Sequence, residues 1–218
     1  MKSFCIIGLG RFGKTLAKTL AEEGAQVMVI DEDPDSVAAV ADIVTSAVIG
    51  DPTNEAVLRT SGVKNYDCAI VSISKKIDDS VLVTLMLKDL GIGWVVARSV
   101  SELHTRVLEK IGADQIVFPE RDMGEKFAYM LGRENVLDYI EFSDEYSIVE
   151  IKVPESWLGK DLIKLDIRRK YNITVIAVRT ESGKIDISPG PNRVFRPGDT
   201  ATLVGMNRDI DNIVRDAK

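Results

Sequence analysis

The feature that most constrains the fold of this chain is a glycine-rich turn between a short apolar run and a helix-forming segment. The run FCII (residues 4–7) leads directly into GLGRFG (residues 8–13), and the next apolar run, residues 27–30, ends at Asp31. Strand, glycine turn, helix, second strand and acid in this order are typical of a nucleotide-binding βαβ unit. The first half of the chain is therefore expected to form a parallel sheet of this type.

The three glycines of the turn have separate predicted roles. Gly8 allows the tight turn off the first strand, Gly10 has no side chain to hold a pyrophosphate away, and Gly13 lets helix and strand pack closely. The helix N-terminus offers free N–H groups to phosphates, and Asp31 can accept hydrogen bonds from ribose hydroxyls. The turn therefore predicts that the chain binds an adenine nucleotide.

The same residues also fit a second nucleotide-binding pattern. Gly8 to Thr15 reads G-x-x-x-x-G-K-T, which is the P-loop of nucleoside triphosphatases. A P-loop needs no glycine at its third position, whereas a dinucleotide turn requires one there, and Gly10 supplies it. Lys14 and Thr15 are then ordinary residues of the first helical turn, and a P-loop ATPase remains the alternative.

Apolar runs alternate with helix-period segments through the first half of the chain, which predicts a parallel sheet covered on both faces. The expected strands are residues 3–7, 26–30, 45–49, 67–72, 94–98 and 115–118. The expected helices are residues 11–22, 34–41, 54–61, 78–90, 102–111 and 122–133. Asp33, Thr53 and Ser101 are predicted to cap the second, third and fifth helices. Helix 78–90 is apolar nearly all round, which predicts burial against the sheet or a partner subunit.

The pattern changes after about residue 136, where short alternating runs are separated by turn signals. Strands are expected at residues 146–153, 174–179, 184–187 and 200–205, with helices at 157–170 and 209–216. The predicted fold class is α/β, a Rossmann-like doubly wound parallel sheet, followed by a second, smaller α+β domain.

Composition excludes several classes of function. The net charge is −6 and no basic run exceeds Arg168-Arg169-Lys170, which argues against nucleic acid as a partner. No apolar stretch reaches the roughly 18 to 20 residues that cross a bilayer, so we expect no membrane insertion. Cys5 and Cys68 fall in predicted core strands, and the single histidine, His104, is predicted to lie at the surface.

Motifs along the whole chain resemble those of one family. They are GLGRFG at 8–13, VLEKIGAD at 107–114, PERD at 119–122, ENVLD at 134–138, SDEYS at 143–147 and LGKDL at 158–162. By these motifs the chain resembles the cytosolic regulators of bacterial potassium uptake, the Ktr/Trk family. The resemblance implies an RCK N-terminal Rossmann domain over residues 1–120, a crossover helix and linker over 121–143, and a TrkA-C domain over 144–218.

The resemblance also implies a cytoplasmic gating subunit that binds ATP or ADP, with NAD or NADH as the alternative ligand. Homodimers would assemble into an octameric ring under a membrane potassium-transporting subunit of the KtrB or TrkH type, at the inner face of the cell membrane. The implied nucleotide-site residues are Gly8, Gly10, Arg11, Phe12, Gly13, Asp31, Glu32, Asp51, Ser72 and Arg98.

Within that set, the resemblance gives three charged residues individual roles. Arg11 would reach a terminal phosphate across the dimer interface, Asp51 would lie beside the adenine, and Arg98 would lie near the phosphates. A guanidinium that meets a third phosphate makes a contact that ADP cannot offer. The alternatives are a solvated first-turn side chain for Arg11 and an ordinary turn residue for Asp51.

Two further ligands follow from the resemblance. Glu120 corresponds to a position where a divalent cation bridges two subunits, and the alternative is an exposed carboxylate at a helix start. Some relatives bind cyclic di-AMP between two C-terminal domains, and the alternative for that surface is a plain hydrophobic dimer interface. The candidate residues for cyclic di-AMP are Ile163, Ile167, Arg168, Val175 and Pro191.

An enzyme is the remaining alternative, either an NAD-dependent oxidoreductase or the P-loop ATPase. Hydride transfer needs a proton relay, and no tyrosine in this chain has a lysine four positions later. His104 is the only imidazole. The sequence therefore favours nucleotide sensing over catalysis.

Overall fold

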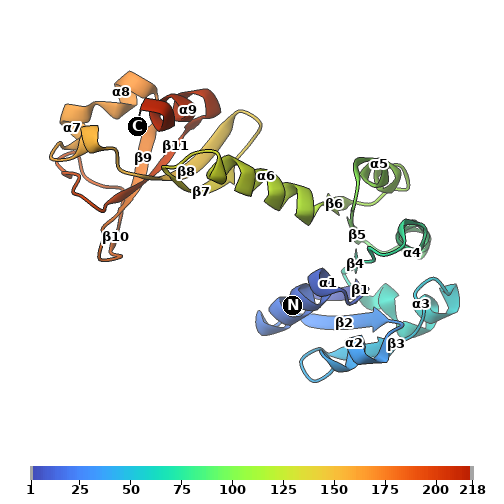
Figure 1. The fold of residues 1–218 in the computed structure, drawn as a ribbon. Helices are drawn as coiled ribbons and strands as arrows, with labels where there is room; N and C mark the ends of the chain where they lie inside the picture. Colours follow the sequence, from blue (N-terminus) through green and yellow to red (C-terminus); the bar gives the residue numbers. More distant parts are fainter. Residues whose placement is uncertain (1, 217–218) are drawn as a thin grey trace. The chain divides into compact units, whose positions relative to one another are not determined.

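The computed structural model describes residues 2–216 of the 218-residue chain. Contacts divide the chain into two compact units, residues 1–120 and residues 121–218, named here the N-terminal unit and the C-terminal unit. Each unit has its own sheet (Figure 1). Each unit also has its own hydrophobic core.

The N-terminal unit is built on a six-stranded parallel sheet in the order β3-β2-β1-β4-β5-β6. The chain winds outward from β1 through β2 and β3, and then crosses to the other side of β1 to continue through β4. This order confirms the predicted doubly wound sheet. The strands are β1 (Ser3–Ile7), β2 (Gln26–Asp31), β3 (Ser46–Ile49), β4 (Cys68–Val71), β5 (Trp94–Arg98) and β6 (Gln115–Val117).

Helices cover both faces of this sheet because successive side chains of a strand point to opposite faces. Cys5 and Ile7 of β1 pack in the cluster that contains Leu58 of α3, whereas Ile6 packs with Ala17 of α1. The helices of the unit are α1 (Arg11–Glu22), α2 (Pro34–Ala38), α3 (Glu55–Ser61), α4 (Ile77–Asp89) and α5 (Glu102–Lys110), with a 3₁₀ turn η1 (Val63–Asn65).

The C-terminal unit is an antiparallel sheet in the order β10-β9-β11-β8-β7, covered by short helices. Alternate residues of β8 and β11 are buried, and Leu203 pairs with Val149 in the centre of the core. The Trp157 and Phe195 rings pack in the same core, with centroids 5.4 Å apart. The strands are β7 (Val136–Glu141), β8 (Tyr146–Lys152), β9 (Thr174–Arg179), β10 (Ile185–Ile187) and β11 (Thr200–Met206). The helices are α6 (Pro119–Leu131), whose first two residues belong to the N-terminal unit, α7 (Leu162–Leu165), α8 (Ile167–Tyr171) and α9 (Asn207–Asp216), with η2 (Glu155–Trp157).

Two predictions about the C-terminal half are wrong. Residues 157–170 do not form one helix, because Asp166 adopts a left-handed conformation (φ 48°) that separates α7 from α8. The predicted connector contains strand β7, which pairs with β8 through backbone hydrogen bonds that local sequence alone does not specify.

One prediction about the N-terminal helices is also revised. The cap of α3 is Asn54 rather than Thr53, since the Asn54 side chain accepts the Ala56 N–H at 3.0 Å. Helix α4 is buried on one side, where Val83 is fully buried, whereas Leu82 is 43% exposed in the single chain. Burial of that exposed side against a partner subunit stays a prediction. Asp33 and Ser101 cap α2 and α5 as predicted.

Candidate functional site

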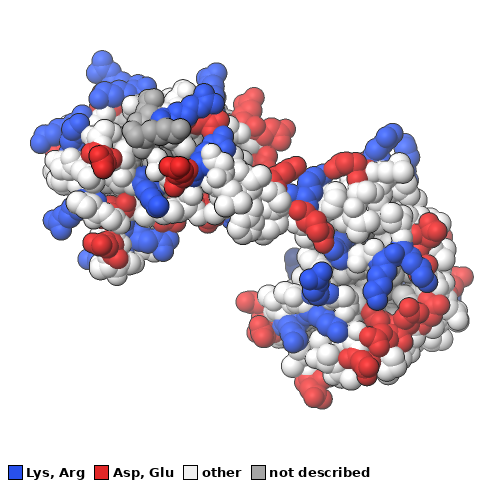
Figure 2. Space-filling view, viewed as in Figure 1, with Lys and Arg blue, Asp and Glu red and all other residues white. Residues whose placement is uncertain are grey.

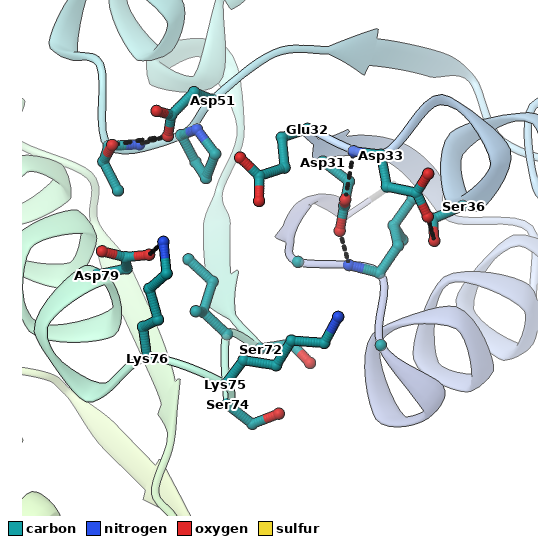
Figure 3. A pocket seen from close by; sticks show the side chains of 16 residues that line it. Asp31, Glu32, Asp33, Ser36, Asp51, Ser72, Ser74, Lys75, Lys76 and Asp79 are labelled. Atoms are coloured by element: carbon teal, nitrogen blue, oxygen red, sulfur yellow. Dashed lines mark hydrogen bonds and ion pairs between the residues drawn. The ribbon is translucent and has the colours of Figure 1, made fainter.

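A cavity of about 230 Å³ lies at the carboxyl ends of the central strands of the N-terminal unit (Figure 3). Its walls come from the segments that follow β1, β2, β3 and β4. The chain winds in opposite directions from β1 and β4, and ligands of open α/β sheets bind in the crevice at such a switch point. The lining residues are Gly8, Leu9, Gly10, Asp31, Glu32, Asp33, Ser36, Asp51, Pro52, Thr53, Ser72, Ile73, Ser74, Lys75, Lys76 and Asp79.

The three glycines of the turn have different surroundings, which fit three different roles. Gly8 has φ +94°, and a Cβ there would lie 3.0 Å from the backbone N of Ile73. A Cβ on Gly13 would lie only 2.1 Å from the carbonyl O of Gly8, so α1 packs directly on the turn. A Cβ on Gly10 would meet no described atom within 4 Å. Because packing within the chain does not require a small residue at Gly10, the open space there is available to a ligand.

The N-terminus of α1 opens at the same place. Gly10 is its N-cap, and the first helical hydrogen bond runs from the Lys14 N–H to the Gly10 carbonyl at 2.9 Å. Within the described residues no side chain caps this helix, and its first turn holds no acid. The preceding N–H groups of the first turn are therefore the donors that an anion can use.

Asp31 holds the turn in place from the end of β2. Its Oδ2 accepts the Leu9 N–H at 2.5 Å and its Oδ1 accepts the Asp33 N–H at 2.9 Å (Figure 3). The sequence did not indicate this structural role. Each carboxylate oxygen can accept a second hydrogen bond, so the proposed contact with a ribose hydroxyl remains available.

Two more carboxylates of the cavity are fixed by their own turns. Asp33 accepts the Ser36 hydroxyl and caps α2, and the Ser36 hydrogen bond is the largest cause that lowers the pKa of Asp33. Asp51 accepts the hydroxyl and the N–H of Thr53 at 2.6 and 2.9 Å, which lowers the pKa of Asp51. Asp51 is thus a turn residue, which was the alternative interpretation of its sequence position. It also lines the cavity.

The segment between β4 and α4 supplies side chains that the sequence analysis missed. Lys75 and Lys76 line the cavity, and the Lys76 ammonium lies 3.5 Å from Asp79. Ser72, which was predicted, is only 2% exposed, and its Oγ has no hydrogen-bond partner among the described residues. The available signal in the sequence was two lysines three and four positions after the predicted strand 67–72, which ends beside the glycine turn.

Four predicted nucleotide-site residues, Arg11, Phe12, Gly13 and Arg98, lie outside the cavity lining. Arg11 is exposed on the first turn of α1. Arg98 forms an ion pair with Glu120, and its guanidinium lies 5.7 Å from the Phe12 ring centroid. The structure thus joins Arg98 and Glu120, which the sequence analysis had assigned to a phosphate site and a cation site.

The two cysteines and the histidine, which could take part in metal or acid–base chemistry, are buried. The part of the chain that the structure describes holds no cluster of three or more metal-ligating side chains. Burial raises the pKa of Cys5, and burial is the main cause that raises the pKa of Cys68 to about 11. The surface position predicted for His104 is wrong: the side chain is 1% exposed, and burial lowers its pKa.

The surface predicted for cyclic di-AMP is only partly exposed. Ile167 is 3% exposed and belongs to the core of the C-terminal unit, so its predicted place in a surface cleft is wrong for the single chain. Ile163 is 60% exposed, and its N–H donates to the Pro191 carbonyl at 3.3 Å. Arg168 is exposed and Val175 is half-buried against the core.

On the face drawn in Figure 2, Lys and Arg side chains lie among Asp and Glu side chains rather than in a continuous basic band. Within residues 2–216, no helix is long and apolar enough to cross a membrane.

The fold and the site together define a class of protein: a doubly wound domain with a nucleotide-type glycine turn, followed by a domain with its own antiparallel sheet. Two known families within this class match the chain. The TrkA-N domain family matches residues 4–119 and the TrkA-C domain family matches residues 147–216. The chain belongs to the TrkA-N family.

Relatives of known name match nearly the whole chain. Ktr system potassium uptake protein C of Bacillus subtilis is 44% identical over 209 residues, 96% of this chain and 94% of that protein. Protein A of the same system and organism is 42% identical with the same coverage. Among solved structures, the GsuK RCK domain matches the fold with a TM-score of 0.67 at 21% identity. That match covers 98% of this chain, which spans about half of the solved chain (47%).

Proposed function

We propose that this chain is the regulatory subunit of a potassium uptake system, and that an adenine nucleotide bound at the glycine turn controls a membrane potassium-transporting subunit. Similarity to two Ktr system potassium uptake proteins over nearly their whole length supports the first part. The observation that carries the second part is the open space at Gly10, which lies in the switch-point cavity beside an uncapped helix N-terminus.

In this proposal the nucleotide lies across the carboxyl ends of the central strands. Its ribose is held by Asp31, its adenine lies on the side of Asp51, and its phosphates face the first turn of α1. ATP and ADP are the proposed ligands, with NAD or NADH as the alternative. Membership of a family of uptake proteins supports sensing rather than catalysis, so the ligand is not expected to be turned over.

The signal would pass through an assembly of RCK homodimers, proposed to form an octameric ring at the inner face of the membrane. A ligand shifts a conformational equilibrium only when it binds the two states with different affinities. Arg11, exposed on α1, is the proposed source of that difference, since it would contact the terminal phosphate of ATP from a neighbouring subunit. A membrane partner of the KtrB or TrkH type completes the proposal.

Two further ligands remain predictions. A divalent cation at Glu120 would share this carboxylate with the Arg98 guanidinium that pairs with it. Cyclic di-AMP would use Ile163, Arg168, Val175 and Pro191 without the buried Ile167.

Thermal denaturation of the full chain with ATP, ADP, NAD, NADH or cyclic di-AMP tests the proposal. A ligand present at 100 times its Kd and bound only to the folded state adds about 2.7 kcal/mol of stability. We expect ATP and ADP to raise the melting temperature and to compete for one site per chain. Failure of all five compounds to shift the melting temperature would overturn nucleotide binding, and steady hydrolysis of ATP would overturn the sensing role.

A further inference from the structure

The cavity at the glycine turn is lined by five carboxylate residues and two lysines. The carboxylates repel a phosphate unless a cation in the cavity is free to bind that phosphate. The carboxylates are Asp31, Glu32, Asp33, Asp51 and Asp79. The proposed ligand carries at least two negative charges, so it needs a positive group at the end of the cavity where its phosphates lie. The arrangement of the two lysines shows which of them can supply it.

Lys76 is already engaged with neighbouring acids. Its ammonium lies 3.5 Å from the Asp79 carboxylate, and its charge also helps to lower the pKa of Asp51, after the larger effect of the Thr53 hydrogen bonds. Figure 3 shows the Lys76 side chain turned toward Asp79.

Lys75 points the other way. In Figure 3 its side chain extends across the cavity, away from Lys76, with the ammonium on the side where Asp31 and Asp33 lie. The structure records no ion pair for Lys75 within the described residues. Arg11 and Arg98 do not replace it, because neither lines the cavity and Arg98 is paired with Glu120.

A second polar group of the same segment also lacks a partner. Ser72 is 2% exposed and lines the cavity, and its Oγ has no hydrogen-bond partner in residues 2–216. Buried hydroxyls in native proteins are generally hydrogen-bonded, so an unpaired hydroxyl on the wall of a cavity indicates a site that a ligand completes. Ser72 packs against the glycine turn, since a Cβ on Gly13 would lie 3.1 Å from its Oγ. The segment between β4 and α4 therefore places an unpaired hydroxyl and a lysine beside that turn.

We infer that Lys75 is the cation with which the nucleotide's own chain binds the phosphates, and that Ser72 donates its hydroxyl to the same ligand. This inference rests on the proposed function and deepens it, because it names the residue that makes the site prefer a nucleotide over the uncharged nucleoside. A single lysine that reaches over the glycine turn holds phosphates against the α1 N-terminus and offsets the repulsion from the acids around them.

The test compares Lys75→Gln with Lys76→Gln in the full chain. Both changes remove one exposed positive charge from the same cavity, so Lys76→Gln is the matched control. Calorimetric titration with ADP and with adenosine measures the affinity of each variant. We expect Lys75→Gln to weaken ADP binding by about tenfold or more, the loss typical of one charge-assisted hydrogen bond, with adenosine affinity unchanged. Lys76→Gln should weaken ADP by less than about twofold, and Lys75→Arg should restore most of the affinity.

The outcomes separate this inference from the proposal beneath it. If the unmodified chain binds none of ATP, ADP, NAD and NADH, the proposed function fails and the role of Lys75 fails with it. If the unmodified chain binds ADP but the two glutamine variants lose affinity equally, or Lys75→Gln weakens adenosine as much as ADP, only the role of Lys75 is overturned.

Discussion

Replacing Gly10 with alanine should remove nucleotide binding while it leaves the fold intact, whereas the same change at Gly13 should damage the fold. A Cβ on Gly10 would enter open space, with no described atom within 4 Å. The backbone of Gly10, at φ −65° and ψ −176°, is allowed for alanine. A Cβ on Gly13 would approach the Gly8 carbonyl O to 2.1 Å, although real Cβ atoms essentially never come closer than 3.0 Å.

The structure sets the size of both effects. Alanine at Gly13 needs the helix and the turn to separate by about 0.9 Å (3.0 − 2.1). Overpacking that shifts the backbone costs about 1–3 kcal/mol, and the lower entropy of the unfolded chain offsets only about 0.4–1 kcal/mol of it. At Gly10 the same entropy gain roughly cancels the loss of a favourable N-cap residue, so stability should change by less than about 0.5 kcal/mol.

Urea unfolding and calorimetric titration with ADP measure the two effects separately. We expect Gly10→Ala to keep the unfolding midpoint and to lose at least tenfold in ADP affinity, which is about 1.4 kcal/mol. Adenosine, which has no phosphate to approach the turn, should bind this variant as well as it binds the unmodified chain. Wild-type ADP affinity in a folded Gly10→Ala variant would refute the placement of the phosphates.

Three other changes test individual side chains. Asp31→Ala should weaken the binding of every adenosine ligand. It should also destabilise the chain by about 1–3 kcal/mol, because the Leu9 N–H loses its acceptor. Asp31→Asn keeps an acceptor, so thermal denaturation should show that it recovers part of this stability. Arg11→Ala should weaken ATP more than ADP in the assembled protein, and equal losses measured by titration would remove its proposed role. Burial lowers the pKa of His104 in the folded chain below its ordinary value of 6.5, so the unfolded state binds more protons as the pH falls through about 6.5 and stability decreases there. His104→Gln should remove this loss of stability between pH 7.5 and 5.5. If the melting temperature of the variant depends on pH as that of the unmodified chain does, the proposed effect of His104 is contradicted.

The local sequence pattern predicted those elements and caps whose formation depends on residues close together in the chain. The strand, glycine turn and helix that open the chain follow from apolar runs and from glycines with special conformations, and β1 and α1 have the predicted bounds. The caps at Asp33 and Ser101 were predictable for the same reason, since a cap bonds to N–H groups two or three residues away. Motifs along the whole chain were enough to indicate the family that the comparisons show.

Contacts between distant segments decided the rest. His104 is polar and follows a polar loop, yet it is buried, and no local pattern records that burial. Strand β7 forms because β8 offers it a backbone ladder. In the site, the sequence placed Gly8, Gly10 and Asp31 together, since they belong to one βαβ unit. Only the folded sheet brings the β4–α4 segment to face that turn and joins Arg98 to Glu120, because adjacency in a parallel sheet depends on strand order and not on distance along the chain.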